Sequence, residues 1–228
     1  TNDFNGALDA TGTYPVGQTI VTWTILDNAG NSAICQTIIT IEEHEDPQIT
    51  CPSDITQHTD PGMCNANVNV PVPLTSDNCG VQSVVNDFNG SADASDLYPL
   101  GVTTVTWTVT DIYGNTANCQ MTITIVDNEL PQITCPADIS QTADPGQCQA
   151  AVTVPAPVTS DNCGVQSYSN DFNGTSNASD TYPVGITTVI WTILDVNGNS
   201  NTCTMTVEVS DDELPVVSCP GDLTATCD

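Results

Sequence analysis

Oxygen-bearing side chains recur at fixed positions along this chain and could together hold a metal cation. The acidic stretches EEHEDPQITCP, VDNELPQITCP and SDDELPVVSCP are separated by one constant interval, and the motifs SDNCG and D..GN recur beside them. Carboxylate and amide oxygens are the ligands of calcium, which takes six to eight of them. The chain has 28 acidic residues and no Lys or Arg to pair with them, so a bound cation would relieve their repulsion.

The cysteines form the second set of chemically reactive residues. The chain has 11 of them at regular spacings, without any CxxC pair and with only 2 histidines. Structural zinc sites use closely spaced ligand pairs, so this pattern does not favour zinc. It favours a disulfide framework formed in an oxidising, extracellular compartment.

Both sets follow an internal repeat of 84 residues, marked by Trp23, Trp107 and Trp191. The same spacing is kept by Tyr14, Tyr98 and Tyr182, by Cys35, Cys119 and Cys203, and by Cys51, Cys135 and Cys219. Such regularity indicates an array of like units. We name the three copies after their tryptophans.

The residues between these markers predict β-strands. Apolar residues alternate with threonine, glutamine, asparagine or proline in the stretches VTTVTWTVTD, CQMTITIVD and NANVNVPVP. A period of two with β-branched residues is typical of half-buried strands. Gly and Pro fill the gaps and no helical period appears. The sequence therefore predicts an all-β fold in which each unit is a compact β-sandwich, with the tryptophans in the core.

The acidic, proline-containing stretches are interpreted as linkers that enter the first strand of a unit. On this basis we expect whole repeats at 44–127 and 128–211. Residues 1–43 then form the C-terminal half of a preceding repeat, and residues 212–228 form the first strand of a further one. We expect the chain to be a window on a longer covalent array, with strand complementation between chains as the alternative.

Several motifs resemble the hyalin repeat (HYR) family: ITCPADI, TSDNCG, YPVG.TTV.WT, D..GN...C and a final TITIVD. The resemblance covers nearly the whole chain. It implies tandem immunoglobulin-like β-sandwiches in extracellular proteins linked to adhesion or structure, and it supplies no catalytic residues. One departure is Cys227, which follows Cys219 by fewer residues than Cys64 follows Cys51.

Four cysteines in each whole repeat allow three pairings, and the sequence alone does not choose among them. The pairing that we favour is Cys51–Cys64, Cys79–Cys119, Cys135–Cys148 and Cys163–Cys203, with Cys219–Cys227 as a shortened version of the first pair. Cys35 is equivalent to Cys119, and its partner would then lie in an upstream half-repeat.

The immunoglobulin-like fold predicts where calcium would bind, because two of its loops lie at the same end of the sandwich as the incoming linker. One junction would gather Glu45, Asp46, Asp77, Asn78, Asp111 and Asn115, and the next Asp127, Glu129, Asp161, Asn162, Asp195 and Asn199. Asp46, Asp77 and Asp111 are the preferred ligands at the first junction, and Asp127, Asp161 and Asp195 at the second. The alternative is that Asp, Asn and Gly serve only as turn formers. The motif NDFNG has the same two interpretations.

Composition and the lack of recurring catalytic residues exclude other functions. Without Lys or Arg the chain cannot neutralise phosphates, and an anionic membrane would repel it, so we expect neither nucleic acid nor direct membrane contact. His44 and His58 do not recur in the other copies, and turns explain the paired acids that glycoside hydrolysis would need. We therefore predict that the chain is not an enzyme.

The predicted function is structural. We expect a secreted protein at the cell surface or outside the cell, forming a stalk, matrix component or filament stiffened by disulfides and calcium. Its partners would be further repeats of the same chain or neighbouring copies of itself. The alternative is an adhesin segment that binds a glycan or protein ligand. The near-interchangeable units favour the structural role, because a binding module should carry loops specific to one unit.

Overall fold

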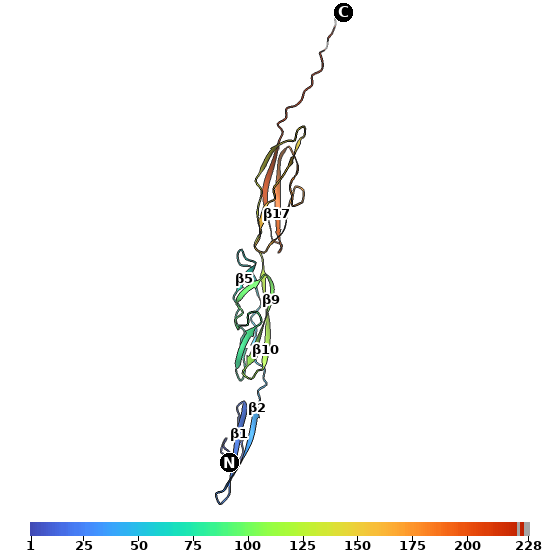
Figure 1. The fold of residues 1–228 in the computed structure, drawn as a ribbon. Helices are drawn as coiled ribbons and strands as arrows, with labels where there is room; N and C mark the ends of the chain where they lie inside the picture. Colours follow the sequence, from blue (N-terminus) through green and yellow to red (C-terminus); the bar gives the residue numbers. More distant parts are fainter. Residues whose placement is uncertain (223, 226–228) are drawn as a thin grey trace. The chain divides into compact units, whose positions relative to one another are not determined.

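The computed structural model describes residues 1–222, 224 and 225, and every element that these residues form is a β-strand (Figure 1). The predicted all-β class of tandem β-sandwich-like repeats is confirmed. The chain divides into two compact units, described here separately. Unit 1 comprises Thr1–Asp54, Asn69–Asp96 and Thr104–Thr122, and unit 2 comprises Ile55–Val68, Leu97–Thr103 and the described part of Ile123–Asp228. None of the described residues belongs to a helix able to cross a membrane.

The Trp191 copy lies within unit 2 and shows the strand pattern of one repeat. Its strands are β11 (Gln132–Thr134), β12 (Ile139–Thr142), β13 (Gln149–Val152), β14 (Val158–Ser160), β15 (Val165–Asn170), β16 (Asp180–Pro183), β17 (Gly185–Asp195) and β18 (Ser200–Ser210). The main sheet has the order β12-β18-β17-β15, in which only β12 and β18 are parallel neighbours. Two short antiparallel pairs, β11-β14 and β13-β16, complete the copy.

The Trp107 copy repeats these strands 84 residues earlier. They are β3 (Gln48–Thr50), β4 (Ile55–His58), β5 (Asn65–Val68), β6 (Leu74–Ser76), β7 (Val81–Asn86), β8 (Asp96–Pro99), β9 (Gly101–Asp111) and β10 (Thr116–Val126). The sheet order β4-β10-β9-β7 and the short pairs β3-β6 and β5-β8 match those of the Trp191 copy. The same strand pattern is therefore formed twice.

The Trp23 copy contributes a hairpin of β1 (Gly17–Leu26) and β2 (Ser32–Ile41) to unit 1 (Figure 1). The register runs from Gly17 opposite Ile41 to Leu26 opposite Ser32. Ile25 of this hairpin is 70% exposed, whereas the equivalent Ile193 is fully buried.

The predicted core position of the repeating tryptophan is confirmed in two copies. Trp107 and Trp191 are fully buried, whereas Trp23 in the β1–β2 hairpin is only half-buried. In the Trp191 copy, the core around this side chain includes Val189 and Met205 from the paired strands β17 and β18. The alternation of apolar residues with threonine places the apolar residues inside, as expected for half-buried strands.

The strand predicted at NANVNVPVP is shorter than the sequence suggested. β5 ends at Val68, and although Val70 is buried, Val72 is 57% exposed. The reason is the proline at position 71, which has no N–H to donate to a neighbouring strand. The N–H of Val70 instead donates to the Ser95 hydroxyl at 2.9 Å.

The NDFNG motif forms a turn organised by its buried first asparagine. The Oδ1 atom of Asn86 accepts the backbone N–H groups of Phe88 and Asn89 at 2.9 Å, and its Nδ2 donates to the Ser91 carbonyl at 2.6 Å. Asp87 accepts the N–H of Thr106 on β9 at 2.8 Å. These side chains are satisfied by the backbone, which fits the turn interpretation of this motif.

The disulfides differ from the favoured pairing. The described residues form Cys51–Cys119, Cys135–Cys203 and Cys64–Cys163. The favoured pairs Cys51–Cys64, Cys79–Cys119, Cys135–Cys148 and Cys163–Cys203 are therefore wrong, and Cys79 and Cys148 are free thiols. The favoured pair Cys219–Cys227 contains a residue outside the described part of the chain.

The parallel pairing of β12 with β18 explains the observed bond. Ile139 lies opposite Val207, and Cys135 and Cys203 each precede that pair by the same number of residues. The register therefore places the two cysteines side by side, with Cα atoms 5.7 Å apart. From Cys135, β12 carries the chain away by about 3.3 Å per residue before Cys148 is reached, and a disulfide needs Cα atoms within about 7 Å.

We expect a peptide map of the non-reduced protein to recover Cys51 with Cys119, Cys135 with Cys203, and Cys64 with Cys163. The chain has no site for trypsin, but an acidic residue lies between every two successive cysteines, so cleavage at Asp and Glu separates them all. Mapping after alkylation of free thiols, with a reduced sample as control, measures the pairing. Recovery of Cys135 joined to Cys148 would contradict the parallel register.

Candidate metal centre

Three aspartates from separate segments of unit 2 converge on one place. Asp127 directly follows β10, Asp161 directly follows β14, and Asp195 is the last residue of β17. One carboxylate oxygen from each lies within 4.8 Å of the other two. Asp127 and Asp195 are buried, and Asp161 is half-buried. The strand ends thus bring together three residues that were predicted from the sequence as metal ligands.

Asp195 is held by the turn that its own D..GN motif forms. Its Oδ1 accepts the N–H groups of Asn197 and Asn199 at 2.8 Å, and its Oδ2 accepts the Asn199 side-chain amide at 2.8 Å. Gly198 makes the turn possible because its φ of 95° is unfavourable for other residues. Burial raises the pKa of Asp195, but the hydrogen bonds from Asn199, Asn197 and Gly198 outweigh it, so the pKa lies below its ordinary value.

The other two aspartates each leave one buried oxygen without a hydrogen-bond donor. Asp161 accepts the N–H groups of Cys163 and Gly164 at 2.8 Å through Oδ2, while its Oδ1 has no partner. Asp127 accepts the Glu129 N–H at 3.1 Å and the Asn162 amide at 3.2 Å through Oδ1, while its Oδ2 has no partner. The side-chain oxygen of Asn162 is also buried without a partner.

These unpartnered oxygens fit a hard cation. A buried acceptor without a donor costs about 1–3 kcal/mol, and neighbouring carboxylates add mutual repulsion. Asp127, Asp161 and Asn162 together present three such oxygens beside the ionised Asp195. Oxygen donors with several negative charges suit calcium better than softer metals. Asp161 and Asn162 also line part of a surface pocket.

Two other predicted ligands of this junction have different contacts. The Asn199 amide donates to Asp195 and also to the Asp127 carbonyl, at 3.3 Å, so it orients the cluster. Glu129 accepts the N–H of Gly62 at 2.8 Å and is not among the three converging residues. Both residues hold the linker against neighbouring turns.

The first junction, within unit 1, repeats several of these contacts. Asp111 is fully buried and accepts the Asn115 N–H and side-chain amide, each at 2.8 Å. Asp77 accepts the N–H groups of Cys79 and Gly80, and its Oδ1 is buried without a partner. Glu45 accepts the Asn78 amide at 2.9 Å. The pKa of the Cys79 thiol is raised by burial and then by the charges of Glu43, Asp77, Asp111 and Glu45.

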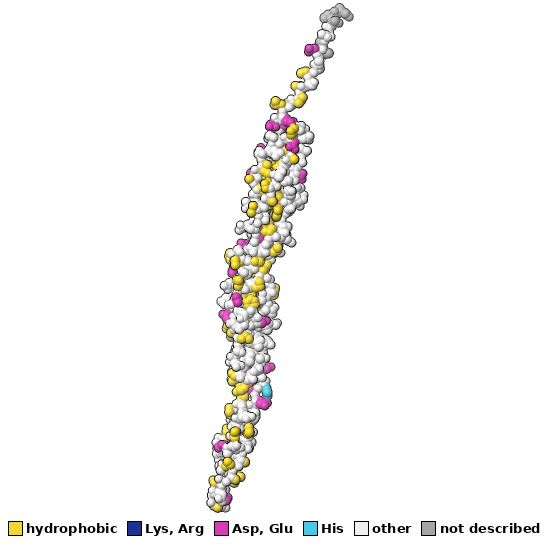
Figure 2. Space-filling view, viewed as in Figure 1, with side chains coloured by type: hydrophobic (Ala, Val, Ile, Leu, Met, Phe, Trp, Pro, Cys, Tyr) yellow, Lys and Arg dark blue, Asp and Glu magenta, His cyan; other side chains and the backbone are white. Residues whose placement is uncertain are grey.

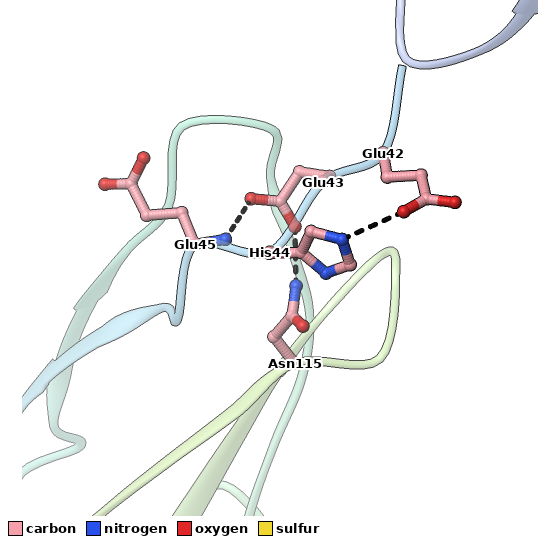
Figure 3. A network of polar contacts seen from close by, with 5 residues as sticks. All are labelled: Glu42, Glu43, His44, Glu45 and Asn115. Atoms are coloured by element: carbon pink, nitrogen blue, oxygen red, sulfur yellow. Dashed lines mark hydrogen bonds and ion pairs between the residues drawn. The ribbon is translucent and has the colours of Figure 1, made fainter. Parts of the chain in front are cut away.

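Glu43 also belongs to this first junction and was not predicted from the sequence. The Asn115 amide donates to Glu43 at 2.5 Å, and Glu43 accepts the N–H of Glu45 at 2.7 Å (Figure 3). The neighbouring His44 faces Glu42 instead, at 3.2 Å. Glu43 lies 84 residues before Asp127, so the repeat period could have identified it as the equivalent ligand. Asp46, the predicted ligand of this junction, is exposed and is equivalent to Leu130.

The fold and these junctions define a class of protein: tandem β-sandwich repeats with acidic linkers and disulfides. The HYR domain family matches residues 43–125 and 126–209, and the chain belongs to this family.

Relatives with similar sequences include two hyalins. Hyalin of Lytechinus variegatus is 35% identical over 222 residues, which cover 93% of this chain and 41% of that protein. Hyalin of Strongylocentrotus purpuratus is 33% identical over 204 residues, which cover 87% of this chain and 16% of that protein. The sushi, von Willebrand factor type A, EGF and pentraxin domain-containing protein 1 of Rattus norvegicus is 31% identical over 196 residues, which cover 84% of this chain and 5% of that protein. The chain thus spans less than half of each relative.

Among solved structures, the protocadherin gammaB7 EC3-6 cis-dimer structure aligns with 86% of this chain and 58% of that chain. The identity is 17% and the TM-score is 0.36. A TM-score of this size supports no further argument.

Asp195→Asn should make the protein less stable at neutral pH by about 1–3 kcal/mol, because the new amide would face the Asn199 amide. The pKa of Asp195 is lowered on folding, so its stabilisation is complete above the ordinary value of 3.8 and is lost as the pH falls below it. The melting temperature of the variant should therefore approach that of the unmodified chain as the pH falls below the ordinary pKa of 3.8.

Melting curves in metal-free buffer measure this convergence. The matched control is Asp212→Asn, which removes the same charge from an exposed side chain. A gap between Asp195→Asn and the unmodified chain that stays constant with pH would contradict the hydrogen-bond account.

Proposed function

We propose that this chain is a segment of an extracellular structural array, such as a surface stalk, matrix component or filament. In this proposal, whole repeats at 44–127 and 128–211 lie between a partial repeat at 1–43 and the first strand of another at 212–228. The HYR family membership and the hyalin relatives support a tandem array. The disulfides support an oxidising, extracellular location, and further repeats or neighbouring copies would be the partners.

Calcium would stiffen the junctions of this array. The observation that carries this step is the set of buried oxygens without donors on Asp127, Asp161 and Asn162. Asp127 belongs to the linker, whereas Asp161 and Asp195 belong to two loops of the Trp191 copy. A calcium ion would supply the positive charge that these oxygens lack and would hold the linker to both loops.

The charge of the chain gives this ion a second role. The formal net charge is −28, and the visible face in Figure 2 carries acidic side chains and no Lys or Arg. At each junction, carboxylates of the linker approach carboxylates of the next repeat's loops. Neutralising them locally would let the linker and loops remain together under physiological salt, where screening acts over about 8 Å.

We expect calcium to raise the melting temperature and chelation to lower it. An ion that binds only the folded protein stabilises it by about 2.7 kcal/mol at a concentration 100 times its Kd. Melting curves across a calcium series at fixed ionic strength measure the effect. Equal stabilisation by sodium or magnesium would indicate simple screening and would contradict a calcium site.

Asp161→Asn provides a second test of the calcium site. The substitution should not destabilise the calcium-free protein, but it should weaken the stabilisation by calcium. Its new Oδ1 can still accept the N–H groups of Cys163 and Gly164, while its Nδ2 becomes a donor beside the neighbouring carboxylates. Without calcium, the variant should be as stable as the unmodified chain or more stable, and with calcium it should respond much less. Asp212→Asn should keep the full response.

Electron microscopy of the native material tests the structural role itself. Filaments, stalks or a matrix labelled by an antibody against the repeats are expected. A dispersed monomer whose chain ends with these repeats would contradict the array.

A further inference from the structure

The disulfide Cys64–Cys163 joins two consecutive copies of the repeat, whereas the other two disulfides each lie within one copy. Cys64 lies in the turn between β4 and β5 of the Trp107 copy, and Cys163 lies in the SDNCG loop of the Trp191 copy. Their Cα atoms are 4.8 Å apart, within unit 2. The structure thus contains a covalent link across one junction, in addition to the peptide chain.

Hydrogen bonds hold the two sides of this link together. The Asn162 amide donates to the carbonyl of Met63 at 3.0 Å and to Asp127 at 3.2 Å. Gly62, in the same turn as Cys64, donates its N–H to Glu129 of the linker at 2.8 Å. The turn, the linker and the loop therefore contact one another around the bond, beside the cluster of aspartates.

The turn that carries Cys64 has a counterpart around Cys148. In the first turn, the backbone N–H of Asp60 donates to the carbonyl of Asn65 at 2.8 Å, and in the second the backbone N–H of Asp144 donates to the carbonyl of Gln149 at 2.8 Å. The contact with the linker also recurs, because the N–H of Gly146 donates to Glu213 at 2.9 Å. Cys148 is an exposed free thiol in this chain. It therefore occupies the same position as Cys64, next to a linker of the same kind.

The loop that carries Cys163 has a counterpart around Cys79. Asp161 accepts the N–H groups of Cys163 and Gly164, and Asp77 accepts those of Cys79 and Gly80, at 2.7–2.8 Å in each case. Cys79 is a free thiol. Cys148 and Cys79, two of the four free cysteines among the described residues, thus occupy the turn position and the loop position of the Cys64–Cys163 bond.

We propose that every junction of the array is closed by one such disulfide, formed between the turn cysteine of one repeat and the loop cysteine of the next. Cys148 would bond the loop cysteine of a following repeat, and Cys79 the turn cysteine of a preceding repeat. The inference rests on the proposed tandem array, and it names a covalent partner for Cys79 and for Cys148. It requires neither calcium nor a particular role for the array.

Each closure oxidises two thiols to one disulfide and releases two protons and two electrons. A small disulfide oxidant such as oxidised glutathione accepts the electrons. One thiolate first attacks the oxidant and forms a mixed disulfide, releasing one glutathione thiol. The second cysteine then attacks the mixed disulfide and releases the other glutathione.

The test inserts a second copy of residues 128–211 directly after residue 211 of the full chain. This adds one junction, at which Cys148 faces the inserted equivalent of Cys163. The protein is oxidised with a glutathione redox buffer, alkylated, cleaved at Asp and mapped without reduction. In the unmodified chain, all of the Cys148 peptide should be alkylated.

In the extended chain, we expect a new peptide that joins Cys148 to the Cys163 sequence, with no loss of the Cys64–Cys163 peptide. The alkylated fraction of Cys148 should fall from all to about half, because one of the two copies is bonded and only the inserted copy stays free. Replacing the inserted Cys163 equivalent with Ser should restore full alkylation. A doubled yield of the Cys135–Cys203 peptide shows that the inserted repeat has folded.

Full alkylation of Cys148 in the folded extended chain would overturn the inference. So would a bond between Cys148 and Cys135. Either result would leave the calcium response and the microscopy unaffected, so failure of this inference is distinguishable from failure of the proposed function.

Discussion

Repulsion between carboxylates that have no Lys or Arg partner is the constraint on which this structure depends. With 28 acidic residues and no Lys or Arg, the chain must satisfy its carboxylates with backbone N–H groups, side-chain amides or bound cations. The turns use the first two means. Asp195 accepts three hydrogen bonds within its own turn and stays ionised although it is buried. The same residues that shape the turns therefore concentrate negative charge at the repeat junction.

The junction uses the two oxygens of an aspartate differently. In Asp161, backbone N–H groups bind Oδ2 and fix the side chain, while Oδ1 is left without a donor. Asp127 shows the same division between its bonded Oδ1 and its unpartnered Oδ2. A turn former and a cation ligand are thus compatible roles for one residue, so the two interpretations of these motifs do not exclude each other.

The sequence predicts the features that depend on local pattern or on the period. Alternating apolar residues locate β9, β17 and the buried Trp191, because one face of each strand is covered. The disulfides could not be predicted in this way, since Cys135 meets Cys203 only through the long-range parallel register of β12 with β18. Cys64–Cys163 requires in addition that two copies meet. Glu43 could have been predicted from the period, because it lies 84 residues before Asp127. Asp46 was predicted in its place because it also belongs to the acidic linker.

The covalent link and the aspartate cluster lie at the same junction, and each would favour the other without being required for it. Without the Cys64–Cys163 bond, repulsion would favour states in which the linker separates from the loop that carries Asp161. The bond restricts those states, so the carboxylates remain close before any ion arrives. An ion that bound there would meet a preformed set of oxygens, and little of its binding free energy would be spent on ordering the chain. Such a cation would in turn lower the electrostatic cost of the state in which the two cysteines are adjacent. Because the period repeats both features together, each further junction would couple them in the same way.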